Sequence, residues 1–142
     1  MKSLAAILIA LGLASCGQDD PGVVIEKAEF RPPLGSTGIG VGYFTIRSDK
    51  DDRIVSVSSP SADSIEIHAS VTHGDNVSMQ RLNGVDLPAG KTVKFESGGM
   101  HLMVFSPRAG GRALTFPITI ELQSGATPTT GFRVITGAAD HS

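Results

Sequence analysis

The sequence is poor in the residue types that support several common functions. It has no tryptophan, one tyrosine and one cysteine in 142 residues, and its formal net charge is only -2. One cysteine cannot form a disulfide within the chain, and without a basic patch there is no electrostatic case for nucleic acid. No Ser-His-Asp arrangement with supporting sequence, zinc-enzyme motif or phosphate loop is present. We therefore expect neither an enzyme nor a nucleic-acid partner.

The residues that are abundant favour a single β domain. Hydrophobic residues make up 40% of the chain and charged residues 18%, which suits an ordinary packed core. The 17 glycines, 8 prolines and many β-branched residues favour short strands joined by turns, and no stretch shows a sustained helical period. The pattern predicts an all-β sandwich or small barrel. The predicted strands are Val23–Phe30, Gly40–Arg47, Arg53–Ser58, Ile65–Val71, Val77–Leu82, Lys91–Glu96, His101–Phe105, Ala113–Leu122 and Gly131–Thr136.

The N-terminus has the pattern of an export signal. Lys2 precedes the apolar run 4–13, which is too short to span a bilayer, and Leu-Ala-Ser-Cys-Gly follows at 13–17. These residues resemble the lipobox of bacterial lipoproteins. The resemblance implies a signal peptide at 1–15 and a lipid on Cys16, and hence anchoring to a membrane; a plain secretory signal is the alternative. We expect 16–22 to form a tether, 23–137 the folded domain and 138–142 a short tail.

Alternation of apolar and polar residues predicts which side chains face the core. In the strand 113–122 the even positions are apolar, so we expect them to be buried, while Pro117 predicts an edge or bulged strand. Leu102 and Val104 likewise form the core face of their strand, which turns His101 and Met103 to the other face. The predicted buried positions of the strand 113–122 are Leu114, Phe116, Ile118, Ile120 and Leu122.

Two histidines and two methionines are predicted to converge on one face of the sheet. His101 and Met103 lie about 7 Å apart at Cα on the same face of a strand. His68 points away from the core, and a turn at 73–76 brings Met79 opposite it or one diagonal away. Thioether sulfur is soft and neutral, so it selects Cu(I) over zinc or magnesium, and it cannot be lost to disulfides outside the cytoplasm. The sequence therefore predicts a Cu(I) site.

The ligand spacing resembles that of a known family. Ten residues separate His68 from Met79, twenty-one separate Met79 from His101, and Met103 completes a His-x-Met pair. This pattern is similar to the signature of the periplasmic copper chaperones of the copper A (PCu(A)C) family, and the similarity runs from about residue 23 to 116. It implies a cupredoxin-like Greek-key β-sandwich that delivers Cu(I) to acceptors such as the copper centre of cytochrome oxidase. Supporting blocks are Gly42–Ile46, Ile65–His68, Leu87–Gly90 and Gly98–Met103.

Several alternatives stay open at this point. A copper storage or resistance lipoprotein would use the same ligands, and a structural sandwich of the cell envelope would bind no metal. A blue-copper electron carrier needs a cysteine within the sandwich, so we exclude it. Glu66 shares a face with His68 and is either its hydrogen-bond partner or simply solvated. We expect Met100 to pack in the core, His73 and the tail residue His141 to have no role, and the copper site to be exposed.

Overall fold

The structure is a computed structural model that describes residues 20–108 and 113–137. These residues form an all-β sandwich, as the sequence predicts, and each predicted strand has a counterpart within a few residues. The three-residue strand β6 was not predicted from the sequence. The strands are β1 (Val23–Arg31), β2 (Ile39–Ser48), β3 (Asp52–Ser58), β4 (Ser64–His73), β5 (Asn76–Leu82), β6 (Val85–Leu87), β7 (Thr92–Phe95), β8 (Met100–Phe105), β9 (Thr115–Leu122) and β10 (Thr129–Val134).

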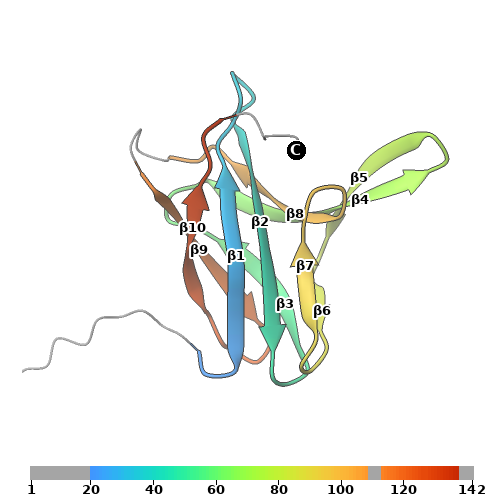
Figure 1. The fold of residues 1–142 in the computed structure, drawn as a ribbon, viewed down its shortest axis with the longest axis vertical. Coiled ribbons are helices and arrows are strands. Elements are labelled where there is room, and N and C mark those ends of the chain that lie inside the picture. The colour runs from blue at the N-terminus through green and yellow to red at the C-terminus, as the bar shows by residue number, and fades with distance from the viewer. Residues whose placement is uncertain (1–19, 109–112, 138–142) are drawn as a thin grey trace, which may run out of the picture.

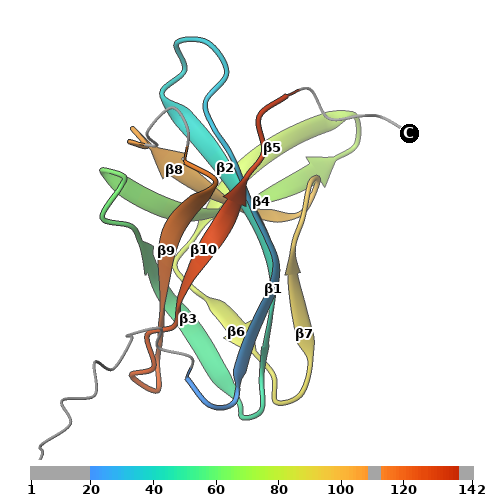
Figure 2. The ribbon, with the colours of Figure 1, turned by 60° about the vertical axis from the view of Figure 1, so that its left-hand side comes forward.

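The strands form one continuous sheet that folds around the core (Figure 1, Figure 2). Their order is β5-β4-β8-β2-β1-β10-β9-β3-β6, and β7 pairs with the second half of β2. Most neighbouring strands are antiparallel, but β1 and β10 run parallel. β8 therefore lies between β4 and β2, and the β4–β5 hairpin projects from the body of the domain at one end of the sheet (Figure 1).

Stacked phenylalanines form the centre of the core. The rings of Phe30 and Phe116 stack with centroids 4.2 Å apart, and those of Phe44 and Phe95 stack at 4.3 Å. Phe132 meets Phe44 in a tilted arrangement at 5.5 Å. These rings come from five different strands, so they join distant parts of the sheet, and aromatic pairs of this kind add to the stability gained from burial alone.

Two glycines on the core face of β2 allow this close packing. A Cβ on Gly40 would lie 2.5 Å from the Phe30 ring, and one on Gly42 would lie 3.2 Å from Leu102. A glycine inside a strand commonly marks such a close approach. Leu102 is fully buried as a result, and its strand β8 is held against β2 with Met103 on the opposite face, beside Val41.

Two predictions about β9 need correction. Leu114 is 81% exposed, because β9 begins only at Thr115 and the alternation therefore does not extend to Leu114. β9 is also an internal strand, between β10 and β3, and the register shift in its ladder with β3 lies in β3, between Ile54 and Ser56, not at Pro117. However, the ladder between β9 and β3 ends at the pair Ser58–Thr119, so Pro117 is paired only with Gly131 of β10. No residue of β3 lies opposite Pro117, and the missing N–H of the proline therefore breaks no hydrogen bond to β3.

The predicted signal peptide, Cys16 and His141 lie outside the described residues. Among residues 20–108 and 113–137, no helix is long and apolar enough to cross a membrane.

Candidate metal centre

His68 and His101 lie directly opposite each other in the antiparallel ladder between β4 and β8. Their ring centroids are 6.1 Å apart. Ile67 and Leu102, the buried pair next to them in the same ladder, point into the core, so the two histidines share the other face as the alternation predicted. Glu66 and Met103 form the next pair on the histidine face.

Each imidazole has one nitrogen in a hydrogen bond and one buried nitrogen without a partner. His68 Nε2 is 2.8 Å from Glu66 Oε2, and His101 Nδ1 is 3.2 Å from the carbonyl oxygen of Gly99. The unpartnered atoms are His68 Nδ1 and His101 Nε2, and among the described side chains they are the only buried nitrogen or oxygen atoms without a hydrogen bond. Such atoms are rare in folded proteins because burial without a bond costs free energy.

The hydrogen-bond partners determine which nitrogen of each neutral ring carries the proton. A carboxylate and a carbonyl oxygen can only accept, so the proton must lie on His68 Nε2 and on His101 Nδ1. The unpartnered nitrogens, His68 Nδ1 and His101 Nε2, therefore each present a lone pair. A soft or borderline metal ion would satisfy both lone pairs, whereas no protein group does so.

The two methionines border the histidine pair from different sides. Met103 is half-buried on β8, two residues from His101 and on the same face. Met79 is opposite Ser70 in the β4–β5 ladder, while Arg81 is the residue opposite His68. Met79 is thus one diagonal from His68, on the same face of the sheet, as the hairpin prediction allowed. It is 63% exposed, since β5 is the outermost strand of the sheet.

The burial of the ring pair differs from the expected exposed site. His101 is only 5% exposed, and the His68 side chain is 14% exposed. The expectation was wrong for the histidines because strand alternation shows only that they point away from the core. It does not reveal that the Gly99 carbonyl meets one ring and the Glu66 carboxylate meets the other. Met79 is the part of the set that lies open to solvent.

The described residues contain no group of three or more His, Cys, Asp or Glu side chains suited to a metal ion. A metal centre on this face would therefore need the thioethers to complete its coordination. Met100 packs against the core, as expected. His73 is exposed at the end of β4, beside the hairpin turn.

Sequence reasoning missed Arg81. Its Nη1 lies 3.3 Å from Glu66 Oε1, so it contacts the carboxylate that holds His68. The sequence did place Arg81 on the face of the proposed metal centre, because Arg81 is two residues from Met79 on the same strand.

Comparison with known proteins identifies relatives of this chain. The sequence profile of a family described as "Putative lipoprotein LpqE-like" matches residues 23–134. A protein of Leifsonia xyli subsp. xyli, named "Putative lipoprotein Lxx21020", is 26% identical, and the match covers 89% of this chain and 84% of that protein.

Solved structures share the fold. A copper-bound PCuAC domain from PmoF2 is 19% identical with a TM-score of 0.67, covering 82% of this chain and 94% of that domain. The solution structure of CuI-DR1885 from Deinococcus radiodurans is 23% identical with a TM-score of 0.61, covering 84% of this chain and 82% of that one. The β-sandwich described above is thus the fold of these domains.

Proposed function

This chain belongs to the LpqE-like lipoprotein family, and from that premise we propose that it is an extracytoplasmic copper chaperone that binds one Cu(I). The ligands are His68 Nδ1, His101 Nε2 and the sulfur atoms of Met79 and Met103. The observation that carries the proposal is the pair of buried, unpartnered imidazole nitrogens on facing rings. Two solved proteins with the same fold, the copper-bound PCuAC domain from PmoF2 and CuI-DR1885, carry copper, which supports the same cargo here.

The chemistry of the donor set favours Cu(I). Two neutral imidazoles and two thioethers leave the charge of the metal ion uncompensated by any ligand, which suits a monovalent soft ion better than Zn(II). Thioethers also persist in an oxidising compartment, where thiolates would be consumed by disulfide formation. The protein performs no bond-making step on a substrate and acts by holding and releasing the ion.

The different exposure of the ligands supports transfer to another protein. The histidines and Met103 form the sheltered part of the site, while Met79 is exposed on the outermost strand. An acceptor approaches from the Met79 side, adds its own ligand and displaces this thioether before the imidazoles release the ion. Copper then passes to an acceptor, such as the copper centre of cytochrome oxidase, without becoming free in solution.

A Cu(I) titration of residues 20–142 tests the function. We expect one equivalent to bind in competition with a chromophoric Cu(I) chelator, and Zn(II) to bind far more weakly. X-ray absorption should show both nitrogen and sulfur scatterers. A protein that takes up no Cu(I) would instead be a structural sandwich of the envelope, and a copper site without sulfur would contradict the proposed ligands.

The proposed location is the periplasm, with the protein attached to a membrane by a lipid on Cys16. The family match and the name of the Leifsonia relative support a lipoprotein. Growth with a radioactive fatty acid should label the wild-type protein and leave Cys16→Ser unlabelled. Equal labelling of the two proteins would contradict lipidation at Cys16.

A further inference from the structure

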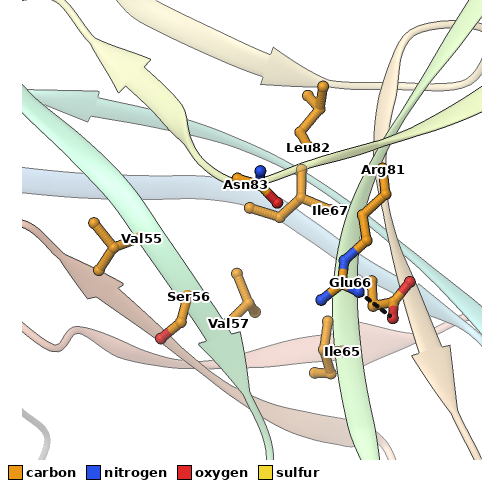
Figure 3. Close-up of a pocket in the computed structure, with 9 residues that line it drawn as sticks. All are labelled: Val55, Ser56, Val57, Ile65, Glu66, Ile67, Arg81, Leu82 and Asn83. Carbon is orange, nitrogen blue, oxygen red and sulfur yellow. Dashed lines mark ion pairs between the residues drawn. The ribbon is translucent and has the colours of Figure 1, made fainter.

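Glu66 connects His68 to Arg81 through its two carboxylate oxygens. Oε2 accepts a hydrogen bond from His68 Nε2 at 2.8 Å, and Oε1 lies 3.3 Å from Arg81 Nη1. Figure 3 shows the Arg81 side chain reaching toward Glu66 at the edge of a pocket of about 220 Å³ between β3, β4 and β5. The Glu66 side chain is 25% exposed, whereas Arg81 is 65% exposed.

We propose that Glu66, held in place by Arg81, is a positioning residue that selects Nδ1 of His68 as the copper-binding nitrogen. This inference rests on the proposed function for its purpose, but the geometry on which it depends is that of the metal-free protein. Rotating the His68 ring by half a turn would break the bond to Glu66 and direct the protonated nitrogen away from its acceptor. The carboxylate thus fixes both the ring orientation and the tautomer.

The alternative roles of Glu66 fit the contacts less well. As a copper ligand it would add a hard, negatively charged oxygen to a site of neutral nitrogen and sulfur donors, which fits Cu(I) less well. As a merely solvated side chain it would show no preference for His68. A carboxylate bonded to a ligating imidazole also makes the ring a stronger donor. The positive charge of Arg81 offsets that of Glu66, so the copper site itself remains close to neutral.

The chain offers a matched control on β1 and β10. Glu29 Oε1 lies 2.8 Å from Arg133 Nη2, which makes a second glutamate–arginine pair between neighbouring strands. The Glu29 side chain is 33% exposed, similar to Glu66, but neither residue of this pair contacts a histidine in the structure. Glu29→Leu therefore removes a comparable ion pair without touching the proposed metal centre.

The first test is the histidine tautomer of the metal-free protein, read from ¹⁵N chemical shifts in a long-range proton–nitrogen spectrum of the ¹⁵N-labelled domain. We expect His68 to carry its proton on Nε2 in the wild type and in Glu29→Leu. Glu66→Leu should lose this preference. Arg81→Gln, which changes a mostly exposed side chain and is therefore expected to fold, should weaken it. A wild-type His68 protonated on Nδ1 would overturn the proposal.

The second test is Cu(I) affinity by competition with a chelator. Glu66→Leu should bind roughly 10–100-fold more weakly than wild type, and Glu29→Leu should bind equally well. Equal affinity of Glu66→Leu and wild type would also overturn the positioning role. A wild-type protein with the expected tautomer that takes up no Cu(I) would contradict the proposed function alone. A wild-type protein that binds Cu(I) with the opposite tautomer would contradict the positioning role alone.

Discussion

His68 and His101 face each other across one ladder pair, with their ring centroids 6.1 Å apart and opposite ring nitrogens used for hydrogen bonds. His68 bonds through Nε2 and His101 through Nδ1, which leaves His68 Nδ1 and His101 Nε2 buried without a hydrogen-bond partner. The metal-free protein thus maintains two buried lone pairs at a cost in stability. Sites arranged for binding commonly carry such a cost, because selection acts on the loaded protein.

The first prediction is that His101→Leu stabilises the metal-free domain while abolishing copper binding. Leucine has a similar volume and removes the buried nitrogen that lacks a partner, so the free energy of unfolding should rise by about 1 kcal/mol. The Gly99 carbonyl keeps a bond from Ser70 N at 3.1 Å, so it is not left unpaired. Urea melts with and without one equivalent of Cu(I) measure both effects. A clear loss of stability in the metal-free variant would contradict the prediction.

The second prediction separates the two faces of β8. Met103→Ala should lower Cu(I) affinity with little effect on the metal-free protein, because Met103 is half-buried on the histidine face. Leu102→Ala should cost roughly 2–5 kcal/mol of unfolding free energy, because Leu102 is fully buried and the change opens a cavity. Urea melts beside a competition titration would test the pair. The assignment of faces is wrong if Met103→Ala unfolds the domain and Leu102→Ala is neutral.

The face on which each proposed ligand lies was predictable from the sequence. In β8, Leu102 and Val104 are fully buried while Met103 is not, so period-two alternation indicated the correct core face. The turn at 73–76 placed Met79 opposite His68 or one diagonal away. The register of the hairpin, which starts from the pair His73–Asn76, decides for the diagonal.

Other features depended on contacts between segments that alternation does not describe. The burial of His101 and its choice of nitrogen depend on the Gly99 carbonyl, which the turn before β8 brings to the ring. Arg81 contacts Glu66 across the ladder between β4 and β5, and the face on which Arg81 lies does not by itself identify this partner. Leu114 shows the limit of the pattern itself, since alternation has no meaning outside the strand.

The third prediction concerns acid stability. Burial raises the pKa of Asp52, but hydrogen bonds from the Ser124 side chain and from the backbone of Arg53 and Ser124 bring it below its ordinary value of 3.8. A carboxylate whose pKa is lower in the folded state contributes stability above the unfolded pKa, and this contribution is lost as pH falls through the folded value. Asp52→Asn should therefore destabilise the domain at neutral pH, with a smaller effect below pH 3.8.

Urea melts at neutral pH and at about pH 3 test this expectation. Asp75→Asn is the control, since Asp75 is exposed in the β4–β5 turn. An Asp52→Asn effect of equal size at both pH values would show that the lost contribution is not that of the charged form.

The last prediction is that Met79 contributes to copper binding but not to the stability of the metal-free domain. Met79 is 63% exposed on the outermost strand, so Met79→Ala should leave the free energy of unfolding of the metal-free protein within about 0.5 kcal/mol of wild type. Cu(I) affinity should fall, and the sulfur signal in X-ray absorption should decrease by one scatterer. Val77→Ala is the matched control, because Val77 is 68% exposed on the same face of the same strand and has no donor atom.

The rate of copper transfer distinguishes Met79 from Met103. If Met79 is displaced first by an acceptor, Met79→Ala already lacks the ligand whose departure begins transfer. It should therefore release Cu(I) to a chelator faster than Met103→Ala, which keeps Met79. Stopped-flow transfer from each variant measures this difference. Unchanged affinity and unchanged release in Met79→Ala would remove Met79 from the ligand set. The site would then consist of His68, His101 and Met103 alone.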